Sequence, residues 1–279
     1  NIEFRKKAKM GVKEVEAIKE EIRDIIERYL EIEDIWGCVP SFANPVKEML
    51  VASDDDVCEV VKKLKDAWNI GEDGILSVTD LLESKNIKVV EIKADLSFDG
   101  LSGYVNNDEN MPFVVVNKSF DVERLRFTGL HELGHLVMNL PEEMEKKDKE
   151  RLCNLFASEM LISRDIFVDV LGERRSDISL QELKVLQAVY GISVDALMFK
   201  AKTVGVISES KHTSFCIRKN KSLAFKDAVE KSSYRGVEES SRFDRLVYRA
   251  LASDMISCSK AAVLLNEPME EVKNKLELV

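Results

Sequence analysis

Long hydrophobic runs are missing from this 279-residue sequence. The chain has no stretch of about 18 consecutive apolar residues, as a transmembrane helix needs, and its N-terminus lacks the apolar core of a secretory signal peptide. The cysteines are odd in number and form no C-x-x-C pair, which argues against a disulfide framework or a zinc ribbon. They are Cys38, Cys58, Cys153, Cys216 and Cys258. We therefore expect a soluble, cytoplasmic protein with reduced thiols and no membrane partner.

A net positive charge is also absent. The formal net charge is -10 at pH 7 and the pI is about 5.1, which argues against a chain-wide attraction to nucleic acid or anionic lipid. The sequence shows no internal repeat and no low-complexity segment. Its length predicts one large domain or two to three smaller ones. The first residue is Asn1 rather than Met, which raises the expectation of a longer parent chain.

The spacing of apolar residues predicts helices at both ends of the chain and strands between them. Helical periodicity is found at 4–34, 56–68 and 78–84. Short β-branched segments, separated by Asp, Asn, Gly and Pro, predict strands at 87–94, 101–105 and 112–117. Further helices are predicted at 149–162, at 180–205 with a turn at 191–193, and as a pair within 240–277. The segment 211–225 is less periodic, so we expect it to be partly extended.

Histidine is scarce, and two of the three histidines lie four residues apart in the segment RLRFTGLHELGHLVMNLP, residues 124–141. Ser119 is the predicted N-cap of a helix here, and Pro141 is its predicted stop. On a helix, His131 and His135 direct two imidazoles at one ion. Glu132 lies beside them, where a carboxylate can act as a general base, which is the H-E-x-x-H arrangement of zinc peptidases. The alternative is a helix whose polar face carries two histidines by chance.

A catalytic zinc site needs a third protein ligand. His212 lies far downstream in a polar segment, and the apolar neighbours of Cys153 favour a core position. Glu150 and Asn154 are four residues apart, so one helical face supplies a carboxylate ligand and a polar group that supports it. Glu159 is nine residues from Glu150 and points to nearly the opposite side. Helical periodicity therefore favours Glu150 over Glu159.

These two segments together resemble a known family. RLRFTGLHELGHLVMN followed by ERLCNLFASEMLIS is similar to the ImmA/IrrE zinc metallopeptidases, which include anti-repressors of phages and mobile elements and radiation-response regulators. Cys153 stands where the family usually has Ala, and Ile162-Ser163 replaces Met-Pro; neither change removes a ligand. The resemblance is good over 100–210 and weak at both ends.

The resemblance implies a gluzincin-like peptidase with Zn²⁺ held by His131, His135 and Glu150, and with Glu132 as the general base. It also implies a substrate, a helix-turn-helix repressor whose cleavage relieves repression. Candidates for the group that stabilises the oxyanion are Tyr104 and Arg126, although these residues also fit a strand aromatic and a structural ion pair. A gluzincin-like arrangement would place the peptide along an edge strand, either 101–105 or 112–117.

The predicted fold is α+β and mostly helical, with a small β-sheet packed on a zincin-like active-site helix and a helical C-terminal region. Along the chain we expect a helical N-terminal or connector region, a metallopeptidase core, a helix-turn-helix-like segment and a C-terminal helical module, at 1–70, 71–165, 166–210 and 211–279.

The rival interpretation is a non-catalytic DNA-binding or sensor regulator with a vestigial peptidase fold. Two helix-turn-helix-like stretches, 181–202 and 256–276, support this interpretation. Phosphate contacts need clustered Lys and Arg, and both stretches mix lysines with acids, so packed helical hairpins explain them better and direct binding to nucleic acid is left open. A third reading is a metal-stabilised interaction protein, which would have no need of Glu132.

Overall fold

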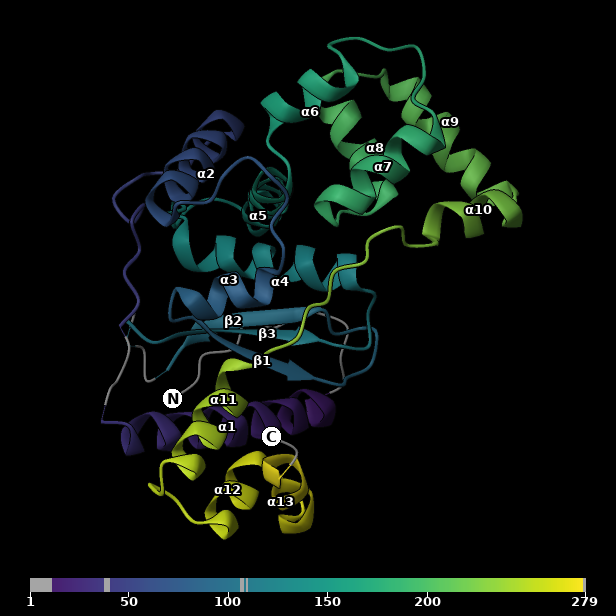
Figure 1. Cartoon of the computed structure of the whole chain (residues 1–279). Helices are drawn as coiled ribbons and strands as arrows, with labels where there is room; N and C mark the ends of the chain where they lie inside the picture. Colours follow the sequence, from purple (N-terminus) through teal and green to yellow (C-terminus); the bar gives the residue numbers. More distant parts are fainter. Residues whose placement is uncertain (1–11, 38–40, 106–107, 109, 278–279) are drawn as a thin grey trace. The chain divides into compact units, whose positions relative to one another are not determined.

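The computed structural model describes residues 12–37, 41–105, 108 and 110–277 (Figure 1). Thirteen helices and three strands are found in this part of the chain, which confirms the mostly helical α+β class. The described residues form two compact units: unit 1 takes them from 1–43, 79–117 and 239–279, and unit 2 from 44–78 and 118–238. The predicted four-part division along the sequence stays a prediction, as does the packing of the sheet on the active-site helix.

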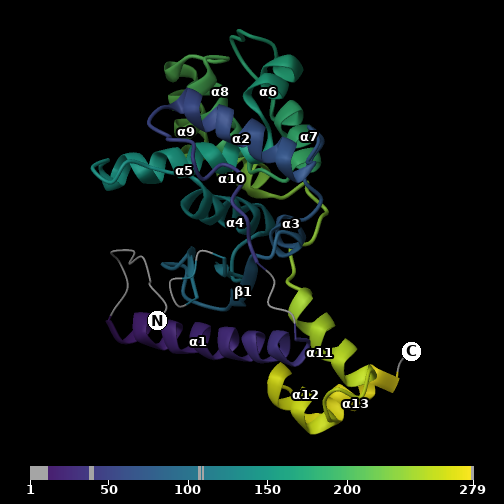
Figure 2. The ribbon, with the colours of Figure 1, turned by 90° about the vertical axis from the view of Figure 1, so that its left-hand side faces the viewer.

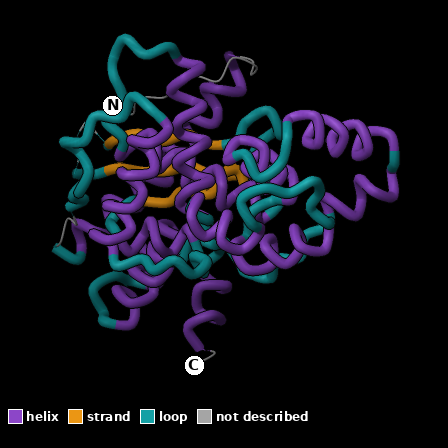
Figure 3. Tube along the Cα trace, turned by 90° about the horizontal axis from the view of Figure 1, so that it is seen from above, coloured by secondary structure: helices purple, strands orange, loops and turns teal. Residues whose placement is uncertain are grey.

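Unit 1 contains a three-stranded mixed sheet, drawn in orange in Figure 3. Its strands are β1 (Lys88–Ile92), β2 (Gly100–Tyr104) and β3 (Pro112–Asn117), in the order β1-β3-β2. β3 pairs in parallel with β1 and antiparallel with β2. Because β3 is the central strand, the prediction of 112–117 as a substrate-binding edge strand is wrong; β2 does lie at an edge of this sheet.

Helix α1 (Val12–Ile35) covers one face of the sheet in unit 1 (Figures 1 and 2). Its apolar residues recur one helical turn apart, at Ile18, Ile22 and Ile26, and pack against the β-branched and aromatic side chains of the strands. The amphipathic helix predicted over 4–34 is therefore confirmed from Val12 onward. Its first residues, 4–11, lie outside the described residues. Helix α3 (Val78–Ser84) has the predicted bounds.

Three helices, and not the predicted two, follow residue 240. They are α11 (Arg242–Ala252), α12 (Cys258–Leu265) and α13 (Met269–Glu277), and they share a core with Ile32 of α1. The extra break falls after Ala252, where Asp254 adopts a left-handed conformation with φ 56°. Ser257 then caps α12 by accepting a hydrogen bond from Lys260 N.

Unit 2 is built on the packing of α4 (Val122–Val137) against α5 (Lys146–Leu161), with α2 (Asp54–Trp68) packed on α5. The predicted N-cap of α4, Ser119, is wrong: Asp121 occupies that position with extended backbone. The helix also ends at Val137, before Pro141. α5 begins three residues earlier than predicted, because the charged residues 146–148 are also helical.

The remainder of unit 2 is helical. α7 (Leu180–Tyr190) and α8 (Val194–Val204) confirm the predicted helix, turn and helix. The segment 211–225 is not extended as we expected, because Ser208 and Ser222 cap α9 (Glu209–Lys221) and α10 (Leu223–Glu230). α6 (Arg164–Leu171) was not predicted; it begins directly after α5, with Ser163 as its N-cap.

Arg126 of α4 is a buried anchor of unit 2. Its guanidinium is fully buried and forms an ion pair with Glu238 at 2.5 Å. Its other N–H groups donate to backbone carbonyls from two loops, those of Ile75, Leu76, Tyr190 and Gly191. Gly191 has φ +60°, and a side chain there would collide with this guanidinium. Arg126 is therefore the structural ion-pair donor of the two roles proposed for it.

Replacing Arg126 with Met should lower the free energy of unfolding by roughly 3–5 kcal/mol, because Glu238 would remain as a buried charge without its partner. Urea unfolding of the two proteins measures this difference. The control is Arg124→Met on the same helix, where the exposed side chain stacks on Phe120 and its loss should cost less than about 1 kcal/mol. Equal losses for the two variants would contradict the anchoring role of Arg126.

Candidate metal centre

Helix α4 places the two predicted histidines side by side. His131 and His135 are one turn apart, and their Nε2 atoms are separated by 3.2 Å. The two rings meet edge to face, with an interplanar angle of 77°. Both side chains are more than nine-tenths buried. Two imidazole nitrogens therefore face one common point.

Helix α5 brings a carboxylate to the same point. Glu150 Oε2 lies 3.3 Å from His131 Nε2, and Glu150 Oε1 lies 3.7 Å from His135 Nε2. Hydrogen bonds with the two imidazoles hold the pKa of Glu150 well below its usual range. The Glu150 side chain is 36% exposed, so solvent reaches the group from this side.

The donor set and its spacing fit a zinc ion. His131, His135 and Glu150 each offer one ligand atom, and these atoms all lie within 4.8 Å of one another. Ligands about 2.0–2.1 Å from a tetrahedral zinc ion are about 3.3 Å apart, close to the separations found here. Two nitrogens and one oxygen are also the ligand types of catalytic zinc sites. We call His131, His135 and Glu150 the His-His-Glu group.

A second residue of the same α5 face supports His131. Asn154, one turn after Glu150, has its Oδ1 2.9 Å from His131 Nδ1. A hydrogen bond donated by Nδ1–H to this oxygen leaves Nε2 free to bind a metal. The helical spacing of Glu150 and Asn154 predicted this pair.

Cys153 contributes to the site in a way that the sequence analysis missed. The side chain is fully buried, as expected of a core residue, but its Sγ also lies 3.4 Å from His135 Nδ1. The spacing could have predicted this contact, because Cys153 is three residues after Glu150 and so lies on the same side of the helix. The outer nitrogens of both histidines therefore have a neighbour on α5.

The glycine of the motif allows the two helices to come together. A Cβ atom at Gly134 would lie 3.1 Å from Cδ1 of Phe156 on α5. The Phe156 ring thus occupies the space that a side chain at position 134 would need. Glu132, two residues earlier, is 4% exposed and adjoins His131 in sequence; its role as general base stays a prediction.

The other ligand candidates lie away from the His-His-Glu group. Glu159 is buried in an ion pair with Lys200 and accepts a hydrogen bond from Arg164 N at 2.7 Å. His212 lies on α9, where its ring packs against Phe199 with centroids 6.0 Å apart. Tyr104, the second oxyanion candidate, lies on β2 of unit 1, and that role stays a prediction.

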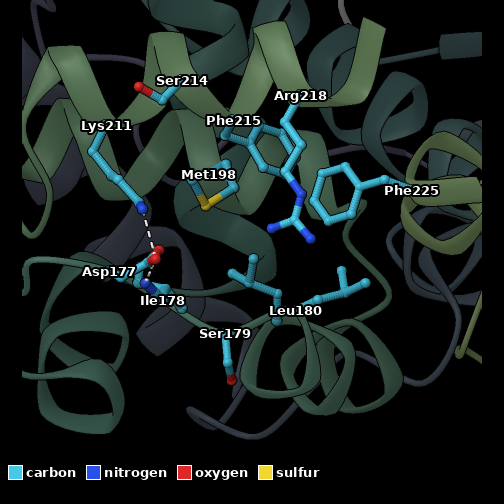
Figure 4. A pocket seen from close by; sticks show the side chains of 11 residues that line it. Asp177, Ile178, Ser179, Leu180, Met198, Lys211, Ser214, Phe215, Arg218 and Phe225 are labelled. Atoms are coloured by element: carbon cyan, nitrogen blue, oxygen red, sulfur yellow. Dashed lines mark hydrogen bonds and ion pairs between the residues drawn. The ribbon is translucent and has the colours of Figure 1, made fainter. Parts of the chain in front are cut away.

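Unit 2 contains two sizeable cavities. One has a volume of about 740 Å³ and is lined by α5 and α8 residues, among them Glu150 and Asn154; we call it the α5–α8 cavity. The other, of about 410 Å³, lies between α7, α8, α9 and α10 and is shown in Figure 4. No member of the His-His-Glu group lines the second cavity. Of these two cavities, the α5–α8 cavity is the one that adjoins the candidate metal centre.

Comparison with known proteins gives one family match. Residues 82–202 match the Peptidase_M78 family model, described as the IrrE N-terminal-like domain. This segment includes the whole His-His-Glu group and Glu132. A search of curated proteins found no match to the chain. Within the described residues, no helix combines the length and apolar character needed to cross a membrane.

Replacing Asn154 with Ala should weaken zinc binding by roughly 10- to 100-fold, because His131 would lose the acceptor that fixes its orientation. Competition with a chelator of known affinity measures this change. His212→Ala serves as the control, since it removes an imidazole that is not part of the group and should leave zinc affinity unchanged. Equal affinities of the wild type and the Asn154 variant would contradict the supporting role.

Proposed function

Since this chain belongs to the ImmA/IrrE family through its IrrE N-terminal-like domain at 82–202, we propose that it is a zinc-dependent metalloendopeptidase. The observation that carries the proposal is the His-His-Glu group, whose nearest ligand atoms are 3.2 to 3.7 Å apart. Its two nitrogens are buried and its carboxylate is half-buried. A chelating group of this kind, open on one side, suits catalysis better than a closed structural site.

In the proposed mechanism, His131, His135 and Glu150 hold the zinc ion. When bound, zinc supplies Lewis-acid polarisation of the peptide carbonyl and lowers the pKa of water at the site. Glu132 accepts the proton of the attacking water and passes it to the leaving amine. Asn154 keeps His131 in the tautomer that presents Nε2. The chain's own residues thus provide positioning and proton transfer.

We propose a helix-turn-helix repressor as the substrate, so that cleavage relieves repression. The support for this substrate is the family membership. The rival DNA-binding role is weakened by the helix pairs that suggested it. In α8, Lys200 is buried in an ion pair with Glu159, and in α13, Lys275 pairs with Glu267 at 2.7 Å. Lys200 is therefore buried away from any phosphate, and Glu267 offsets the charge of Lys275.

Replacing Glu132 with Gln should leave zinc content unchanged and reduce cleavage by roughly 10²- to 10⁴-fold, because the amide cannot take the proton. The experiment is co-expression with a helix-turn-helix repressor as the candidate substrate, followed by detection of a cleaved product. His131→Ala should lose both zinc and cleavage. The control variant, Phe225→Ala, at a residue of the second cavity, should retain both.

Two results would contradict parts of this proposal. Purified protein without stoichiometric zinc, and with a metal content that His131→Ala does not change, would rule out the metal site. Zinc-loaded Glu132→Gln with undiminished cleavage would rule out the general base while leaving the metal ligands in place.

A further inference from the structure

The α5–α8 cavity continues from the metal-facing side of both helices. On α4, Phe127 lies one turn before His131, and on α5, Ser158 lies one turn after Asn154. Phe127, Asn154 and Ser158 all line the cavity, together with Glu150. The cavity therefore adjoins the His-His-Glu group at Glu150.

The uncharged part of the cavity wall is largely apolar, with side chains from three helices. These are Phe127, Leu155, Ala196, Phe199 and Val204. Phe199 is 55% exposed, and its ring packs against His212 with the two centroids 6.0 Å apart. A ligand that covered this ring would remove apolar surface from water. The wall is therefore suited to an apolar group.

Most of the charged lining residues neutralise one another. Lys200 is buried in its ion pair with Glu159 and also donates to Ser158 Oγ at 3.3 Å. Arg151 pairs with Asp54 at 2.5 Å. Since these charges already have partners, they offer little attraction to a charged group inside the cavity. The remaining lysine, Lys147, is exposed.

The second cavity has a different character. Figure 4 shows Lys211 paired with Asp177 and the Arg218 guanidinium directed into the cavity beside Phe225. It shares no lining residue with the α5–α8 cavity, although residues of α8 line both. It therefore supplies a control surface, with a phenylalanine on its wall but no connection to the metal ligands.

We propose that the α5–α8 cavity is a specificity pocket that binds an apolar side chain of the substrate, aromatic or long aliphatic, next to the peptide bond presented to the His-His-Glu group. This inference rests on the proposed peptidase function. The volume of about 740 Å³ lies within the range of sites that enclose organic ligands. Phe127 and Phe199 contact the bound side chain.

The test compares two zinc-binding probes on the zinc-loaded full chain, N-acetylphenylalanine hydroxamate and N-acetylglycine hydroxamate. Both carry the same metal-binding group, so the ratio of their dissociation constants isolates the benzyl side chain. Isothermal titration calorimetry should show that the phenylalanine probe binds roughly 10- to 100-fold more tightly, as expected for burial of one large apolar side chain.

Three variants locate the effect. Phe199→Ala, at a position exposed enough to tolerate the change, should reduce the ratio by roughly three- to tenfold. Ala196→Phe places a ring in the cavity and should also reduce the ratio. Phe225→Ala removes the same ring from the other cavity and should leave the ratio unchanged.

The possible outcomes distinguish failure of the proposed pocket from failure of the proposed peptidase function. A chain that holds stoichiometric zinc but binds both probes equally overturns the pocket and leaves the metal site intact. An unchanged ratio in both Phe199→Ala and Ala196→Phe does the same. A chain that holds no zinc overturns the proposed function, and the pocket assignment with it.

Discussion

Helices α4 and α5 can approach each other closely because Gly134 has no side chain where the Phe156 ring packs. The candidate site depends on this contact. It brings Glu150 within 3.3 Å of one histidine and 3.7 Å of the other, and it places Asn154 on the outer nitrogen of His131. A larger residue at position 134 would separate the helices, and the ligand atoms would move apart with them.

The α4 helix is fixed at its other end by a different kind of interaction. Near the metal ligands, apolar packing sets the spacing, whereas five residues before His131 the buried Arg126 draws two loops and Glu238 onto the helix. His131 and His135 follow the anchored end of α4 and lie on either side of the glycine that packs on α5. This arrangement holds the site in place before any metal binds, which limits the entropy that metal binding must overcome.

Local periodicity predicted most of the site, because its members lie on two helices whose faces can be read from spacing. The pair His131 and His135, and the choice of Glu150 over Glu159, both follow from a repeat of 3.6 residues. Periodicity failed at 211–225, because α9 buries only Phe215 among its side chains and so has no apolar stripe to detect. The α5–α8 cavity could not be predicted from the sequence, because Phe199 of α8 meets the α5 residues only through tertiary packing.

The central claim is that α4 and α5 together bind one zinc ion through two imidazole nitrogens and one carboxylate oxygen. X-ray absorption spectroscopy of the zinc-loaded protein tests it directly. The account predicts a first shell of nitrogen and oxygen at about 2.0–2.1 Å with two imidazoles and no sulfur. A sulfur neighbour at about 2.3 Å would contradict it, because it would make Cys153, rather than Glu150, the ligand supplied by α5.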